Sequence, residues 1–304
     1  MVIILFKELK FYSTVMKKGV SKGQVNTFKK KIKYIIRNII FFKHSKKIAN
    51  FIMNHKYLKN EIYRYPVLCS KIQRPYISNF FNMNKKVETI LSSYEFLDNY
   101  FSKNILDTLY NDGEITVCQV QGKDEKNYII KLHLYTDFEK EGEFNLNCYD
   151  ENENQLSKLT FAFSGDTLLI GGLQGLEKDG DQELLKIATK NLYGVFPKKL
   201  VIEGLYYLFP NCKKLAISNK GHIYLSSRYK YKKYRKINAD YDEFWESFGG
   251  VINNEFWLLP EEIKRKNIED IPSKKRSLYN NRFALLDRLK DSIEDFFAKN
   301  SSSI

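Results

Sequence analysis

Acidic side chains are nearly missing from the first part of this 304-residue chain. Residues 1–86 contain 20 Lys and Arg residues but only two acids, Glu8 and Glu61, which gives this part a net charge of +18. The rest of the chain sums to −4, so the N-terminal part carries the excess behind the overall net charge of +14. Such a positive field attracts phosphates, either of nucleic acid or of anionic lipids. The alternative is a lysine-rich composition without a partner.

Cysteine and histidine are scarce and scattered. The cysteines are Cys69, Cys118, Cys148 and Cys212, and no two of them have CxxC spacing. They also form no compact cluster with the four histidines in the sequence. These absences speak against a structural zinc site, and we expect no metal. A disulfide framework is not expected in a chain of this size, so a reducing compartment fits best.

Long apolar runs are also missing. No stretch of about 18 apolar residues occurs, which speaks against a transmembrane helix. The start, MVIILFKELK, carries its charges after its apolar part, and no small-residue cleavage site follows, so we expect no signal peptide. Neither a GxSxG motif nor a Walker loop is found. We expect a cytoplasmic protein, with a peripheral position on the inner membrane as the alternative.

Apolar residues make up 43% of the chain, enough for a core. Residues 28–51 predict a helix that has Lys and Arg on one face and isoleucines on the other, namely Ile32, Ile35, Ile36, Ile39 and Ile40. A basic amphipathic helix can lie on a membrane surface. More often such a stripe packs on its own domain, and that is the outcome we expect here.

The remaining pattern predicts a mixed fold. A second helical region covers residues 84–110, and five strand-like runs follow, four of which form two hairpins. Beginning with the fifth strand, the order is β–α–α–β–α–β, and an amphipathic C-terminal helix completes the chain. We expect an α+β or α/β fold with a mixed, mainly antiparallel sheet. Its parts are a basic helical N-terminal module, residues 1–86, and an α/β domain, residues 87–304.

The fifth strand, in LLIGGLQG, contains glycines where a buried strand is expected. Gly171 and Gly172 predict a bulge or a close approach of backbone, with Gln174 facing a cleft. A phosphate loop is not expected here, because LEKDGD follows where such a loop needs the start of a helix.

Many short motifs of the chain resemble the VirK/YbjX family of Gram-negative bacteria. The resemblance runs from about residue 74 to 287 and rests on EKEGEFNL, LTFAF, IGGLQG, ATKNLYGVFPKKL, LAISNKGHIY, DYDEFWESFGG, WLLP and IPSKKRSLYNNRFALLD. The biochemical function of that family is unknown. Membership implies a link to virulence, to the cell envelope and to tolerance of cationic antimicrobial peptides.

A fold-level resemblance to acyltransferases of the GNAT type adds a possible chemistry. That fold places a pyrophosphate loop and a helix between two central strands, and here NLYGVFPKKLVIEGLYYLF lies between LLIGGLQG and KKLAISN. The resemblance implies acyl-CoA as the acyl donor. Phe196 stands where that loop has its last glycine, and a helix is inserted before it, so fewer backbone N–H groups are available to a pyrophosphate.

Three residues are candidates for acid–base chemistry. His222 follows a strand and could be a general base, although an exposed turn histidine is the simpler interpretation. Glu141 and Glu143 would share a strand face and could act as paired carboxylates, although a solvated strand edge is the simpler interpretation. These three form the predicted catalytic set.

Basic and polar residues elsewhere are candidates for an anion site. RYKYKKYRK, residues 228–236, alternates cations with tyrosines, as phosphate-binding segments do, and the alternative is a half-buried hairpin with lysines on its edge. In SKKRSLYNNR, cations gather at the start of a helix, where they oppose its dipole. The predicted ligand-binding set is Gly171, Gly172, Gln174, Lys190, Gly194, Asn219, Lys275, Arg276 and Arg282. We therefore expect either an acyltransferase that uses acyl-CoA and acts on an envelope-related substrate, or a non-enzymatic, anion-binding accessory protein that docks on nucleic acid or on an anionic lipid membrane.

Overall fold

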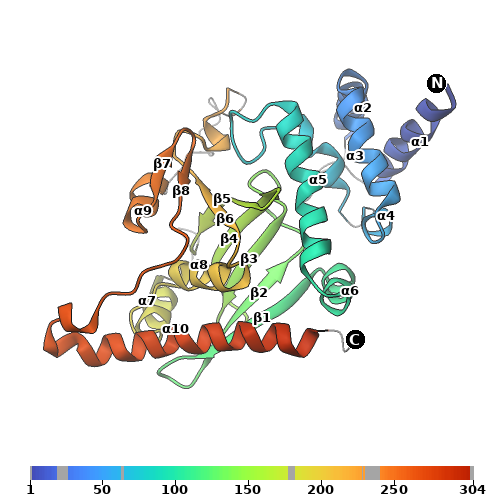
Figure 1. The fold of residues 1–304 in the computed structure, drawn as a ribbon. Coiled ribbons are helices and arrows are strands. Elements are labelled where there is room, and N and C mark those ends of the chain that lie inside the picture. The colour runs from blue at the N-terminus through green and yellow to red at the C-terminus, as the bar shows by residue number, and fades with distance from the viewer. Residues whose placement is uncertain are drawn as a thin grey trace.

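The computed structural model describes residues 2–18, 27–62, 65–176, 182–227, 229 and 240–301. It contains an eight-stranded sheet in the order β1-β2-β3-β4-β5-β6-β8-β7, with helices packed against it (Figure 1). This confirms the predicted mixed, mainly antiparallel fold. Apart from Tyr229, the basic and aromatic segment 228–236 lies outside the described residues.

Helices make up the N-terminal part. They are α1 (Val2–Lys18), α2 (Phe28–Ile40), α3 (Phe42–Asn54), α4 (Leu58–Glu61) and the 3-10 helix η1 (Pro66–Gln73). Two longer helices follow, α5 (Met83–Tyr100) and α6 (Lys103–Asp112), whose first turns are capped by the side chains of Asn82 and Ser102. None of the helices described is both long and apolar enough to cross a bilayer. The division at residue 86 stays a prediction.

The first five strands form an antiparallel meander. They are β1 (Glu114–Gln121), β2 (Asn127–His133), β3 (Phe144–Tyr149), β4 (Gln155–Ser164) and β5 (Thr167–Gln174). β6 (Lys213–Ile217) then pairs in parallel with β5, and β8 (Phe256–Leu258) and β7 (Val251–Asn253) complete the edge. β5 pairs with β6 only over Thr167–Ile170, so the second half of β5 is not paired with β6.

The chain from β5 to β6 passes through α7 (Gln182–Asn191) and α8 (Pro197–Leu208). After β6 come the short helix η2 (Ile223–Leu225), α9 (Tyr241–Ser247), η4 (Ile268–Asp270) and the long α10 (Ser273–Asn300). α10 runs along α8 and the edge strand β1 (Figure 1), where the Ser292 hydroxyl accepts from the Gln119 N–H at 3.1 Å.

One apolar face of the sheet carries the core. The register aligns Leu132 with Leu146 and Phe144 with Phe161, which places their side chains on the same face. α5 contacts this face through Tyr94, whose ring lies 5.5 Å from that of Phe144, and α8 contacts it at Gly204, beside Ile130 and Leu146. Helices therefore cover the apolar face and meet in one continuous hydrophobic core.

Candidate functional site

The two strand glycines form a β-bulge, as predicted. Thr160 of β4 pairs with Gly172, but its neighbour Phe161 pairs with Ile170, so Gly171 is the extra residue. The chain at Glu141 crosses directly over this bulge. A Cβ on Gly171 would lie 1.9 Å from the backbone oxygen of Glu141, and a Cβ on Gly172 would lie 2.0 Å from the side-chain atom Oε2 of Glu141. The close approach is therefore made by the backbone and the carboxyl group of Glu141.

Glu141 and His222 face one another at the bulge. Glu141 Oε1 lies 3.8 Å from His222 Nε2, and both side chains are 2% exposed. The Gln174 amide donates to Glu141 Oε2 at 3.3 Å, and the prediction that this residue faces a cleft stays a prediction. The His222 ring stacks on Tyr241, with centroids 5.3 Å apart and planes at 18°. Burial contradicts the simpler interpretations of these residues as an exposed turn histidine and a solvated strand edge.

Burial sets the ionisation of this pair. It raises the pKa of Glu141 to about 8, because a charged carboxylate would lose its hydration. It lowers the pKa of His222 to about 4 for the same reason. His222 Nδ1 accepts from the Tyr224 N–H at 3.4 Å, and Nε2 has no hydrogen-bond partner among the described residues. At neutral pH the pair therefore consists of a carboxylic acid and a neutral imidazole, and because Nδ1 accepts a hydrogen bond, the ring carries its proton on Nε2, which faces Glu141.

Glu143, the third predicted catalytic residue, belongs to a different buried cluster. Its Oε2 lies 2.8 Å from Lys71 Nζ and accepts from the Tyr94 hydroxyl at 2.9 Å, while Oε1 accepts from the Tyr76 hydroxyl at 2.5 Å. Lys71 also donates to the Gly142 carbonyl at 2.9 Å. Burial lowers the pKa of Lys71, and the nearby Glu143 opposes that shift. Glu143 thus has the contacts of a structural anchor, and Glu141 is the carboxyl that faces His222.

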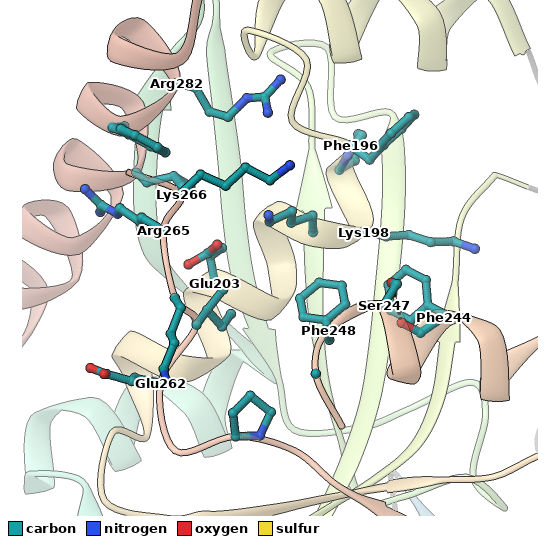
Figure 2. A pocket seen from close by; sticks show the side chains of 18 of the residues that line it. Phe196, Lys198, Glu203, Phe244, Ser247, Phe248, Glu262, Arg265, Lys266 and Arg282 are labelled. Carbon is teal, nitrogen blue, oxygen red and sulfur yellow. Dashed lines mark hydrogen bonds between the residues drawn. The ribbon is translucent and has the colours of Figure 1, made fainter. Parts of the chain in front are cut away.

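A cavity of about 900 Å³ lies at the start of α8 (Figure 2) and is called here the α8 cavity. Its walls come from α8, the end of α9, the chain before η4, and α10. Aromatic side chains line it, including Phe196, Phe244 and Phe248. Two acids, Glu203 and Glu262, meet six basic residues there: Lys198, Lys199, Lys264, Arg265, Lys266 and Arg282. Arg282 and Lys266 reach into the space from the α10 side, opposite Phe196 (Figure 2).

Glu203 is a candidate functional residue that the sequence patterns did not indicate. It lines the α8 cavity but is only 4% exposed, and burial raises its pKa against the opposing effect of Lys199 and Arg265. A signal was present, because Glu203 is the one charged residue in the stretch LVIEGLYYLF. A lone acid inside an apolar helix is costly unless it is paired or has a function.

A smaller cavity of about 340 Å³ joins the α8 cavity to the bulge. The two share Lys198, Phe244 and Ser247, and the smaller one also touches Leu173 and Tyr241. Tyr241 is the ring that stacks on His222, so it separates this cavity from the Glu141–His222 pair. The cavities therefore lead from α8 toward the point where β5 leaves β6.

Of the predicted binding residues, Arg282 lines the α8 cavity. Its Nε donates to the Tyr193 carbonyl at 3.0 Å, and its guanidinium lies 4.4 Å from the Tyr279 ring centroid. Gly194 has φ +77°, a backbone angle that requires glycine, and a Cβ there would lie 2.6 Å from the flexible end of Arg282. The Gly194 and Val195 N–H groups already donate to carbonyls at the end of α7.

The other predicted binding residues lie apart from this cavity. Arg276 donates to the carbonyls of Ile271 and Glu269, and the Asn219 N–H donates to Asp242. Lys190 and Lys275 are exposed, on α7 and α10 respectively. Within the described ranges, no group of three or more His, Cys or acidic side chains is arranged to hold a metal ion.

Comparison with known proteins agrees with the motifs. Residues 23–295 match the model of a family described as "Protein of unknown function (DUF535)". The uncharacterized protein YbjX of Escherichia coli K12 is 30% identical over 273 residues, 87% of this chain and 82% of YbjX. An uncharacterized protein of Haemophilus influenzae is 28% identical over 86% of this chain and 87% of its own length. No solved structure gives a significant match. The chain therefore belongs to the DUF535 family, the family of YbjX that its motifs indicated.

Proposed function

We propose that this protein binds an acyl-CoA-type donor in the α8 cavity and transfers the acyl group to an envelope-related acceptor. The observation that carries the proposal is the composition of that cavity, in which aromatic walls are combined with six basic side chains. Its volume of about 900 Å³ lies near the upper end of the range for small-molecule sites, ~300–1,000 Å³. A ligand with several negative charges and an apolar chain matches both features.

The sheet topology supports the same ligand. β5 and β6 are parallel neighbours that separate after Ile170, and α8 begins beside the opening that results. GNAT-type acyltransferases, which the sequence resembles, bind the acyl donor between two such strands. The Gly194 and Val195 N–H groups are engaged within the protein, and Pro197 has none to offer. Phosphate binding would therefore depend on side chains such as Lys198, Lys266 and Arg282.

Glu203 is the candidate general base of the proposed reaction. Its carboxylate would accept the proton of an attacking amine or hydroxyl as the new bond to the acyl carbon forms. The C–S bond of the thioester then breaks, the thiolate leaves and takes a proton from water, and Glu203 gives its proton to the resulting hydroxide. A raised pKa suits this task, because it brings the base closer to the pKa of the group it deprotonates. The catalytic role predicted for His222 and Glu141 stays a prediction, and it requires Tyr241 to move aside.

Calorimetric titration with CoA, acetyl-CoA and decanoyl-CoA tests the proposal. We expect saturable binding, about 30-fold weaker in the double variant Lys198→Ala, Lys266→Ala, since each lost charge-assisted contact removes about 1 kcal/mol. The control is Lys274→Ala, Lys299→Ala, which removes two exposed charges from α10 outside the cavity. No binding of any CoA species by the folded protein would refute the proposal.

An acyl-transfer assay separates the enzyme from its alternative. Release of free CoA in the presence of amine or hydroxyl acceptors, lost in Glu203→Gln, would support catalysis. Tight binding without transfer to any acceptor would instead support the second candidate, a non-enzymatic protein that binds anions. The abundance of cations in the α8 cavity favours that candidate equally.

A further inference from the structure

The helix α2 turns its apolar side chains away from the protein. Phe28, Ile36, Ile39 and Ile40 are 78%, 49%, 59% and 67% exposed, and Ile32 is 43% exposed. The residues that α2 buries are Tyr34 and Asn38. The expectation that the isoleucine stripe packs on the domain is therefore wrong for Ile32, Ile36, Ile39 and Ile40, whereas Ile35 is partly buried and packs against the core.

A helix advances about 100° per residue, so Tyr34 and Asn38 lie on one side and the exposed isoleucines on the opposite side. The exposed set is Phe28, Ile32, Ile36, Ile39 and Ile40, called here the α2 stripe. A contiguous apolar stripe that faces outward marks an interaction surface rather than a packing surface. Figure 1 places α2 at the outer edge of the molecule, far from α10.

Polar contacts fix this orientation. The Gln73 amide donates to Asn38 Oδ1 at 2.9 Å and to the Tyr34 carbonyl at 3.4 Å. The Ser45 hydroxyl donates to Asn38 Oδ1 at 3.0 Å. These bonds are buried, and rotating α2 to hide its isoleucines would break all of them at a cost of desolvated polar groups. The outward stripe is therefore a stable property of the folded chain.

The charges beside the stripe have one sign. Lys29 and Lys33 of α2 and Lys43 and Lys47 of α3 are exposed, and the sequence has no acidic residue between positions 9 and 60. Long lysine side chains can lie along apolar surface and place their ammonium groups at its border. The result is an apolar strip bordered by positive charge.

We infer that the α2 stripe lies in the surface of an anionic phospholipid bilayer. The isoleucines would enter the boundary between headgroups and acyl chains, while the neighbouring lysines contact the phosphates. A nucleic acid would use the lysines and leave the isoleucines in water, so it accounts for only half of the surface. This inference is independent of the α8 cavity and of any enzymatic activity.

Flotation of the full chain with vesicles tests the inference. We expect binding to vesicles of phosphatidylglycerol and phosphatidylcholine and much weaker binding to phosphatidylcholine alone. Ile36→Asp with Ile39→Asp should weaken binding about 100-fold, since each change removes a buried isoleucine from the bilayer. Lys29→Gln with Lys33→Gln should weaken it about 30-fold.

Two matched controls identify the surface. Val251→Asp with Ile252→Asp replaces exposed apolar residues of β7, and Lys274→Gln with Lys299→Gln replaces exposed lysines of α10; both should bind vesicles as the parent does. Unchanged melting temperatures of all variants would show that folding is intact, as expected for exposed positions. The inference is overturned if the anionic vesicles do not bind, or if the aspartate pair on α2 binds them as well as the parent. Binding to short duplex nucleic acid that ignores the aspartate pair, without vesicle binding, would also overturn it.

Discussion

Glu141 and Glu143 are two residues apart and equally buried, but their surroundings differ in kind. Glu143 has an ammonium group and two phenol hydroxyls within hydrogen-bond distance. Glu141 has one amide contact, at 3.3 Å, and a histidine at 3.8 Å. A buried carboxylate keeps its charge when donors compensate its lost hydration, and otherwise binds a proton. The first cluster therefore stabilises the fold, whereas the second is able to titrate near neutral pH.

The largest expected effect comes from breaking the Glu143 cluster. Lys71→Met leaves the buried Glu143 carboxyl group with only the two phenol donors, and we expect a loss of about 3–5 kcal/mol in the free energy of unfolding. Urea denaturation followed by circular dichroism measures it. The control is Lys85→Met, which breaks an exposed pair with Glu88 and should cost less than about 1 kcal/mol. Equal losses in the two variants would contradict the structural role of Lys71.

A smaller effect is expected from crowding the bulge beneath Glu141. Gly171→Ala places a Cβ where the Glu141 carbonyl oxygen lies, and the strain of such overpacking should cost about 2–3 kcal/mol. Gly175→Ala is the matched control, since its Cβ would meet only the flexible end of Lys198, at 3.1 Å. A stable Gly171→Ala protein would show that the Glu141 segment can move away from β5.

The smallest effect is a pH dependence carried by Glu141. Its pKa of about 8 in the folded protein lies above the value of an unfolded chain, so the folded state holds the proton more tightly. Stability from this group is complete at low pH and is lost as the pH rises toward 8. His222, whose pKa is about 4, acts in the opposite direction, and its contribution is lost as the pH falls from about 6.5 to 4.

Between about pH 6.5 and 8, Glu141 is the member of this pair whose contribution to stability changes. It lowers the free energy of unfolding by at most about 1.4 kcal/mol per pH unit. Denaturation at several pH values should show this decline for the parent and a flatter profile for Glu141→Gln. Subtracting one profile from the other cancels the contribution of all other titrating groups to the free energy of unfolding. Parallel profiles would mean that Glu141 is charged at neutral pH.

Local patterns predicted much of the fold. Alternating residues predicted the hairpins, and two glycines in a strand predicted the bulge at Gly171. The α8 cavity could not be predicted, because its wall combines α8, α9 and α10, which tertiary packing alone brings together. The periodicity of α2 was also recognised, but the direction of its apolar face depends on Gln73, a residue 35 positions after Asn38.

The contact between Lys71 and Glu143 also determines how far the chain can be shortened. A fragment that begins at residue 87 would keep Glu143 and Tyr94 but lose Lys71 and Tyr76, and with them two of the three side-chain donors to that carboxylate. Such a fragment would also lose the ion pair of Arg74 with Glu139 and the bond from Lys71 to the Gly142 carbonyl, so the segment just before β3 depends on the N-terminal helices for its buried polar contacts.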